Sequence, residues 1–323
     1  MIVKFRQATM KVEPYDPPPP EFQGSPEQRV LWAAMQVLER LTHSSGAVAP
    51  LIEADTAEPV KASPISSVAS LERFRAIQTK RVETLVRQRF EEEEGVVLRA
   101  FRSIPSPISP DALDDALTTQ EKAWARVLER IYETVGSPAG ARVWDGFRRK
   151  GLRLKAVNFS PEEAPWMQPL ADYLRQQGAA KVVDITETTR KKLRRALADG
   201  IEAGDSRTGF IARLRNAYSE MSKGRADVIA RNEVLEASAK AQHAAAEASG
   251  VRMQKRWKTA GDSRVREPHR KANNQTRAFD EPYLVGGERL MHPADASLGA
   301  SPGNIILCRC TELYIPIAPR RRR

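Results

Sequence analysis

Cysteine is scarce in this chain, which has two among its 323 residues, Cys308 and Cys310. In an extended chain, residues two apart lie near the limit of the Cα separation that a disulfide can span. The pair therefore cannot staple a fold of this size. We expect the protein to be made in a reducing cytoplasm.

Long apolar runs are also missing. No stretch reaches the roughly 18 consecutive apolar residues that a membrane-spanning helix needs. The first residues, Met1 to Arg6, lack the apolar core and cleavage site of a signal peptide. We therefore expect neither a membrane partner nor export. Aromatic residues make up only 6% of the chain, which favours helices rich in Ala, Leu and Arg.

Positive charge is in excess. Lys and Arg number 52 against 41 Asp and Glu, giving a net charge of +11. Such an excess favours contact with phosphates or with an acidic protein surface, without deciding between them.

The composition changes along the chain, and it divides the sequence into four parts. Residues 1–65 form a proline-rich arm with one helix after Ser25 and a linker, because the run Pro17 to Pro20 favours polyproline II. Such an arm is either a disordered spacer or a segment that lies on a neighbouring subunit. Residues 66–220 form a helical region, 221–317 a C-terminal domain, and 318–323 a basic tail.

Apolar periodicity predicts the helices of the second and third parts. One begins near Val68 and carries the acidic run Glu91 to Glu94 on a solvated face. The other expected helices run from Ser109 to about Val135, from Ser137, from Asp184, from Asp205–Ser206, and from Ser222 to Ser249, with Gly250 ending the last.

Short segments with frequent glycines follow Val251, and they predict a small α+β domain with strands over Arg252–Thr259 and Asn304–Ile315. We therefore predict the fold class α+β: an extended N-terminal arm, a mainly α-helical N-terminal and middle region, and a small α+β C-terminal domain.

Rare residue types gather in this last domain. The segment from Trp257 to His269 has the pattern W-x-T-x-x-D-x-R-V-R-x-x-H, and C-R-C follows at Cys308–Cys310. Upstream, residues 229–233 read I-A-R-N-E. We expect the polar side chains of these motifs to form a structural network around Trp257, with Asp262 buried and paired with Arg264 or Arg266, and Glu233 reaching an arginine of the C-terminal domain. The network comprises Arg231, Glu233, Trp257, Thr259, Asp262, Arg264, Arg266, His269, Cys308, Arg309 and Cys310.

These motifs resemble those of phage minor head proteins of the Mu F type, also called head morphogenesis proteins. The resemblance covers roughly residues 183–317. Asn232 stands where the family usually has Thr, Asn273–Asn274 where an Asp-Gly turn is common, and His292 where an aromatic residue is common.

The resemblance implies a structural virion component at the head interior or portal vertex, assembled in the host cytoplasm. It implies contact with the portal protein and with the major capsid protein or scaffold, and a role in head assembly and in DNA packaging or delivery, with packaged double-stranded DNA as a further partner. From the residues themselves we expect no catalytic residue. The alternatives are a nucleic-acid-processing enzyme that uses the D-R-H and C-R-C residues, and a plain non-specific DNA-binding protein.

An enzyme would use Asp262, the two arginines and His269 for acid–base chemistry on a phosphodiester. However, no second carboxylate follows at a fixed short spacing, and no phosphate-binding glycine loop precedes a helix.

A metal is the next alternative. We expect no cofactor, but His269, His292, Cys308 and Cys310 would make a legitimate tetrahedral zinc set if the C-x-C segment were a strand with both thiols on one face.

A basic cluster suggests non-specific contact with DNA, because phosphate binding requires only clustered charge. Trp257 lies within it as a stacking platform or, more often for a strand residue, as core. The cluster comprises Arg252, Lys255, Arg256, Lys258, Arg270, Lys271, Arg320, Arg321, Arg322 and Arg323.

Overall fold

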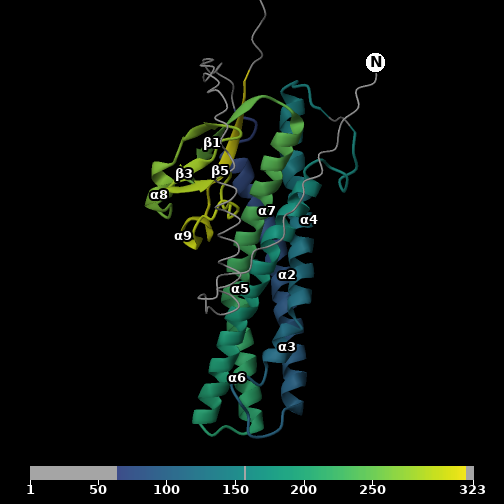
Figure 1. The fold of residues 1–323 in the computed structure, drawn as a ribbon, viewed down its shortest axis with the longest axis vertical. Helices are drawn as coiled ribbons and strands as arrows, with labels where there is room; N and C mark the ends of the chain where they lie inside the picture. The colour runs from purple at the N-terminus through teal and green to yellow at the C-terminus, as the bar shows by residue number, and fades with distance from the viewer. Residues whose placement is uncertain (1–63, 156–157, 318–323) are drawn as a thin grey trace, which may run out of the picture. The chain divides into compact units, whose positions relative to one another are not determined.

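Long helices form most of the computed structural model, which describes residues 64–155 and 158–317. The predicted arm and its helix, almost all of the linker, and the basic tail with Arg320–Arg323 lie outside the described residues. The described elements confirm the fold class α+β, because a helical bundle is followed by a small antiparallel sheet module (Figure 1).

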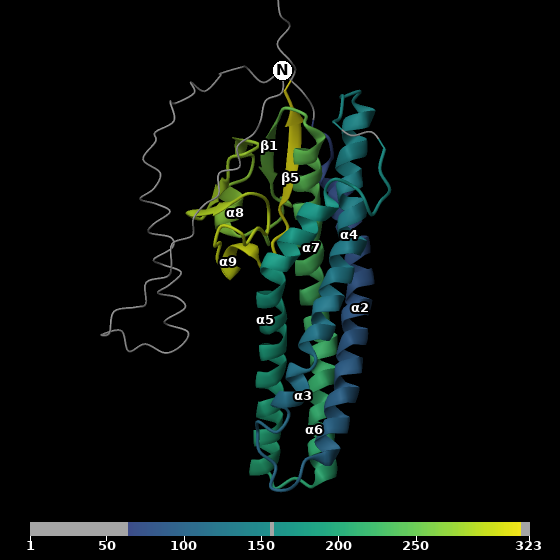
Figure 2. The ribbon, with the colours of Figure 1, turned by 45° about the vertical axis from the view of Figure 1, so that its right-hand side comes forward.

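Four long helices lie side by side: α2 (Val68–Ser103), α4 (Glu121–Arg149), α5 (Met167–Glu202) and α7 (Ala226–Ser249) (Figures 1 and 2). The short α3 (Asp114–Thr118) and the 14-residue α6 (Arg207–Glu220) complete the bundle. The alanine-rich α7 packs against α2 and α4, and small side chains allow this close approach.

Local capping signals end or begin several helices as predicted. The Ser206 hydroxyl accepts a hydrogen bond from the Gly209 amide and caps α6. Gly250 ends α7 with φ of 71°, a left-handed conformation that glycine adopts without a steric penalty.

Other predicted boundaries are wrong, because packing overrides the local signals. Helix α4 continues through Pro138 to Arg149, since its buried face runs on through Val135, Ala139 and Val143. Helix α5 already begins at Met167 and passes through the predicted start at Asp184. The segment after Ser109 forms α3 and then α4 instead of one helix.

The predicted boundary at residue 220 falls within a helical run. A π-helical turn, η1 (Met221–Arg225), joins α6 directly to α7, so Ser222 caps no helix. Single π turns of this kind occur where a helix accommodates an extra residue. Helix α7 therefore packs as part of the bundle. It nevertheless carries the I-A-R-N-E motif of residues 229–233, which the sequence placed in the C-terminal domain.

The C-terminal module runs from β1 to β5. It contains a three-stranded antiparallel sheet in the order β2–β1–β5, and a hairpin of β3 and β4. Its strands are β1 (Met253–Lys258), β2 (Thr276–Ala278), β3 (Tyr283–Val285), β4 (Glu288–Leu290) and β5 (Thr311–Pro316). The predicted strand from Asn304 is wrong at its start, because α9 (Pro302–Ile305) and an irregular segment precede β5. All six residues of β5 are buried, and the strand contacts both α2 and α7.

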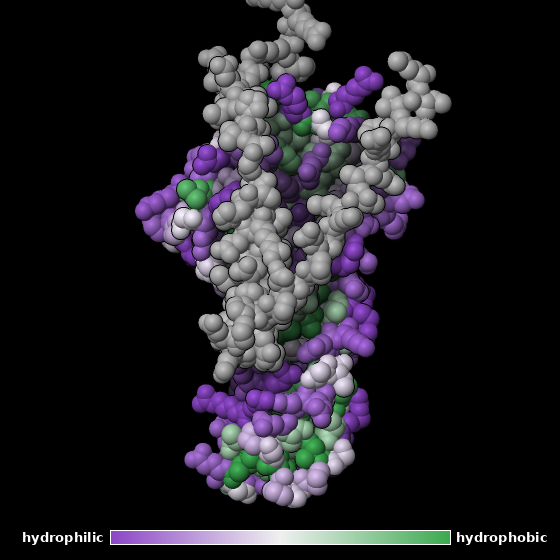
Figure 3. Space-filling model, in the orientation of Figure 1, coloured by the Kyte–Doolittle hydropathy of each residue, from purple (hydrophilic) through white to green (hydrophobic). Residues whose placement is uncertain are grey.

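The described residues form two hydrophobic cores. One runs through the bundle and takes in Met253 and Tyr314 of the sheet. The other lies inside the module around Trp257, Tyr283 and Leu290, and it includes both cysteines. Polar residues cover much of the visible surface, and hydrophobic residues gather at the bundle end where α6 begins (Figure 3). None of the described helices is both long and apolar enough to cross a membrane.

Candidate functional site

His269, Cys308 and Cys310 meet inside the module. His269 lies on the short helix α8 (Glu267–Lys271), and the cysteines lie between α9 and β5. The His269 Nδ1 atom is 3.3 Å from Cys310 Sγ and 3.6 Å from Cys308 Sγ, and all three side chains are buried. The thiols therefore converge through an irregular turn, not through the predicted strand.

Trp257 supports this cluster from β1. Its side chain is fully buried, and its ring packs edge-on against the rings of His269 and Tyr283, with centroids 5.8 and 5.3 Å away. Trp257 is therefore core, and as placed it offers no face on which a base could stack.

Asn304 determines which nitrogen of His269 carries the proton. The Asn304 amide nitrogen donates to the Val285 carbonyl at 3.1 Å and to Glu288 Oε2 at 2.6 Å. Its oxygen must then face His269 Nε2, 3.2 Å away, and accept a hydrogen bond from it. Whenever the ring is neutral, Nδ1 is then the nitrogen with the lone pair and faces the two sulfurs, and only the imidazolium form carries a proton there.

The two thiols titrate as a pair. The pKa of Cys308 is held well below the ordinary value, first by its hydrogen bond with Cys310 and then, against the effect of burial, by His269. The pKa of Cys310 is raised, because the same hydrogen bond and burial both oppose its ionisation. One thiolate is thus easier to form here than two.

Arg75 of α2 holds the backbone of the cysteine segment. Its guanidinium donates to the Cys310 carbonyl at 2.9 Å and to Ser238 Oγ at 3.1 Å. Burial lowers the pKa of Arg75, although the neighbouring cysteines and Glu72 act in the opposite direction. The C-R-C segment is therefore tied to the bundle as well as to its own module.

Asp262 is exposed, so its predicted burial is wrong. It pairs with Arg309 of the C-R-C motif, lies 3.6 Å from the Arg264 guanidinium, and accepts a hydrogen bond from the Arg264 amide at 3.1 Å. The hydrogen bond from Arg309 is the main cause that lowers the pKa of Asp262. Of the two predicted partners of Asp262, Arg264 lies close to its carboxylate. Arg266 does not, because its guanidinium donates to the Ile306 carbonyl at 2.8 Å.

Thr259 follows β1 directly and begins the loop that leads to His269. It is buried, and its amide donates to Asn273 Oδ1 at 3.2 Å. The motif loop is thus anchored at Thr259 and His269, while Asp262 between them faces solvent.

A pocket of about 600 Å³ lies where this loop faces the bundle. Charged side chains surround it, and Cys308 contributes to its wall. Its lining comprises Glu72, Arg75, Ala76, Thr79, Arg231, Val234, Leu235, Ala260, Asp262, Arg264, Leu307, Cys308 and Arg309.

Glu233 does not reach an arginine of the C-terminal module, so that prediction is wrong. Its carboxylate and that of Glu236 face Lys181 of α5, whose Nζ lies 3.2 and 2.7 Å from them. Glu236 also accepts hydrogen bonds from Tyr132 and Tyr173. The helical turn directs Glu233 into the bundle, whereas Arg231 turns outward and pairs with Asp227.

Glu233 and Lys181 perturb each other. Burial raises the pKa of Glu233 despite the opposing effect of Lys181. Burial alone would lower the pKa of Lys181, but the two carboxylates outweigh it, and the pKa is raised.

Lys255 is fully buried, so its predicted contact with DNA is wrong. Its Nζ donates to the Met291 carbonyl at 2.7 Å and lies 3.9 Å from Glu312. The alternation of β1 turns Lys255 and Trp257 inward and leaves Arg256 and Lys258 more accessible.

His292 is buried away from the cysteines, among a second set of polar groups. It lies 4.0 Å from Asp295, and its ring centroid is 5.5 Å from that of His243. His243 in turn bonds Glu312 at 3.0 Å. Sequence analysis missed this set, although Glu312 in an apolar run and His243 in an alanine-rich helix were signals of buried partners.

Most of the other described residues in the predicted DNA-contact set make local contacts. Arg256 donates to Thr276, Lys258 to Asn274, and Arg270 to Glu267. Lys271 lies 3.9 Å from Glu267, and Arg252 is exposed. These residues leave positive charge on the module surface.

Comparison with known proteins agrees with the motifs. The family described as Phage Mu protein F like protein matches residues 191–313, from the later part of α5 into β5. The chain carries a Mu F-like domain. The predicted resemblance over roughly 183–317 is thereby confirmed.

The chain is also similar to a curated protein, the minor head protein GP7 of Bacillus phage SPP1. The two are 29% identical over 130 residues, which are 37% of this chain and 39% of the relative. The chain thus matches about two fifths of that relative's length. No solved structure matches.

Proposed function

We propose that this chain is a structural minor head protein of a phage virion, placed in the head interior or at the portal vertex and assembled in the host cytoplasm. The Mu F-like domain carries the proposal, and the SPP1 relative is named a minor head protein. The finer role is to dock on the portal or inner capsid and to aid head assembly and DNA packaging or delivery.

A structural role also suits the chemistry of the motif residues. His269 is only 2% exposed, and its two nitrogens face Asn304 and the thiols. Asp262 is engaged by Arg309 at the surface. An acid–base pair directed at a substrate would need these groups to share an accessible site. We therefore assign no catalytic residue.

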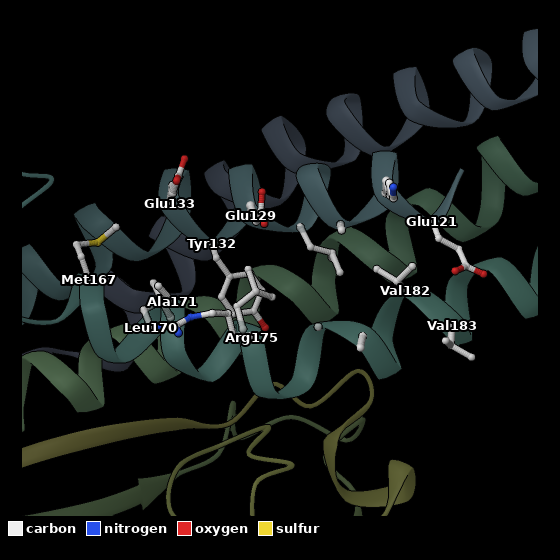
Figure 4. Close-up of a pocket in the computed structure, with 16 residues that line it drawn as sticks. Glu121, Glu129, Tyr132, Glu133, Met167, Leu170, Ala171, Arg175, Val182 and Val183 are labelled. Carbon is white, nitrogen blue, oxygen red and sulfur yellow. The ribbon is translucent and has the colours of Figure 1, made fainter. Parts of the chain in front are cut away.

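We further propose that the helical region provides the docking surface. A groove of about 620 Å³ lies between α4 and α5, with Leu170 and Val182 among its apolar lining (Figure 4). Charged residues, including Glu121, Glu129 and Arg175, also line it. An apolar groove with charged groups around it suits an amphipathic helix, which we assign to the portal protein.

Val183→Glu is expected to weaken portal binding by about 30-fold, corresponding to about 2 kcal/mol, because it puts a charge against an apolar contact. Val183 lines the groove and is 49% exposed, so the substitution leaves the core of the bundle intact. Binding of the full chain to purified portal protein, measured by biolayer interferometry, tests this.

Ile77→Glu is the matched control. Ile77 is 56% exposed on α2 and does not line the groove, and the same charge is introduced. Equal weakening by both variants, or none by Val183→Glu, would contradict docking in the groove. Testing the major capsid protein and scaffold in the same way identifies which head component responds. Deleting 66–220 is less informative, because α7 would lose α2 and α4.

Contact with packaged double-stranded DNA is a second candidate function. The positive charge at the module surface favours it, with Arg252, Lys258 and Lys271 as the test residues. Phosphate contacts of this kind are non-specific and release counterions. We also assign the tail Arg320–Arg323, which lies outside the described residues, to this contact.

In this test Arg252, Lys258 and Lys271 are replaced together by Gln. The logarithm of the DNA-association constant falls linearly with the logarithm of the salt concentration, and the variant should make this slope less steep by about 2 to 3, at about 0.9 per lost phosphate contact. Fluorescence anisotropy with a labelled duplex at several salt concentrations measures this slope. The control changes Lys191, Lys192 and Arg195 of α5 to Gln, an equal loss of charge on the bundle. A strong sequence preference at high salt would refute non-specific contact.

A further inference from the structure

The His269, Cys308 and Cys310 cluster has the dimensions of a metal site. One ligating atom from each residue, Nδ1 and the two Sγ atoms, lies within 4.8 Å of the other two. The two nitrogen–sulfur distances are 3.3 and 3.6 Å. All three residues are buried, and of the three Cys308 borders the 600 Å³ pocket.

Tetrahedral zinc predicts similar separations. With zinc–sulfur bonds of about 2.3 Å and zinc–nitrogen bonds of about 2.0–2.1 Å, neighbouring ligand atoms lie about 3.5–3.8 Å apart. The observed nitrogen–sulfur distances fall close to this range. A small inward or outward movement of the side chains would bring the atoms to bonding positions.

The surroundings of His269 also match those of a zinc ligand. A ligating histidine usually donates its other ring N–H to a neighbouring acceptor, which sets the tautomer and the ring orientation. Here Asn304 Oδ1 accepts a hydrogen bond from Nε2–H, and the Asn304 amide nitrogen is held by Val285 and Glu288. The lone pair on Nδ1 is thereby presented to the same space as the two sulfurs.

We propose that His269, Cys308 and Cys310 bind one zinc ion. Thiolate and imidazole ligands select zinc over magnesium and calcium, which prefer oxygen. Cys308 also lines the 600 Å³ pocket, so a water molecule from that side supplies the fourth ligand. The ion clamps α8 to the segment that precedes β5, and His292, which neighbours His243 and Asp295, takes no part.

Zinc content of the purified full chain tests the proposal. The protein is produced in zinc-supplemented medium with an affinity tag free of histidine, and metal is counted by mass spectrometry. We expect about one zinc ion per chain. The Cys308→Ser/Cys310→Ser variant should lose it, whereas a folded His292→Gln variant should keep it. Wild-type protein without zinc, or a cysteine variant with unchanged zinc, would overturn the proposal.

Cobalt substitution keeps the test valid if the cysteine variant fails to fold. Wild-type protein loaded with Co²⁺ should show thiolate-to-cobalt charge transfer and the intense visible bands of tetrahedral cobalt. Stoichiometric zinc then competes the cobalt away, and both signals vanish. Spectra of octahedral cobalt without charge transfer would exclude the two sulfurs as ligands and overturn the assignment.

Discussion

Glu93→Ala is expected to lower the free energy of unfolding by about 3–5 kcal/mol, because it removes one partner of a buried charged network. The Glu93 carboxylate is fully buried and accepts hydrogen bonds from Trp124 Nε1 at 2.6 Å and from the Tyr218 hydroxyl at 3.1 Å. The buried Arg89 guanidinium lies 3.8 Å away. Alanine leaves the Trp124 and Tyr218 donors without this acceptor and removes the carboxylate beside Arg89. Urea unfolding followed by circular dichroism measures the loss.

Glu91→Ala is the control from the same run of four glutamates. Glu91 is exposed, and surface substitutions of this kind usually change stability by no more than about 0.5 kcal/mol. Equal effects of the two substitutions would show that Glu93 is a solvated residue, as the acidic run alone suggests.

Lys181→Met should cost about 3–5 kcal/mol near pH 8, because it leaves two buried carboxylates without their cation. Methionine retains most of the volume of lysine, so the loss reports charge more than packing. Glu233 and Glu236 lie on α7, and Lys181 on α5, so the variant weakens the contact between these helices.

The cost of Lys181→Met should decrease as the pH falls. Burial already raises the folded-state pKa of Glu233 above its unfolded value, and Lys181 partly offsets this. A carboxyl group whose pKa is higher in the folded state than in the unfolded state stabilises the folded state at pH values below its unfolded pKa, about 4.3 for Glu. This stabilisation is lost as the pH rises through the folded-state pKa. Without Lys181 that pKa rises further, so the penalty grows between about pH 4 and pH 8.

Unfolding of Lys181→Met and wild type across this pH range tests the sign. The exposed Lys191 on the same helix provides the control, as Lys191→Met should leave stability almost unchanged at every pH. A penalty that stays constant with pH, or that grows towards low pH, would contradict our account of Glu233.

Structural features that depend on a few neighbouring residues were predicted correctly. Ser206 caps α6 and Gly250 ends α7, because a hydroxyl near free amides and a residue without Cβ act locally. Trp257 was expected as core from the strand alternation around it, and it is fully buried.

The burial of charged residues was not predictable in this way. Glu93, Lys255 and Asp262 all lie in charged or polar segments, yet the first two are buried and the third is exposed. The partners of Glu93 lie 31 and 125 residues away at Trp124 and Tyr218. Only the packed bundle brings such groups together, so a local pattern cannot distinguish a solvated face from a buried network.

The C-terminal module separates the two contributions most clearly. The sequence by itself determined the Mu F-like motifs and identified His269, His292, Cys308 and Cys310 as unusual, because scarce residue types at set spacings are visible without coordinates. Only the tertiary structure decided that His269 meets the two thiols and that His292 joins His243 instead. The reason is that α8 and the turn before β5 converge in one core, while the His292 loop packs beside α7, and the distance along the chain encodes neither contact.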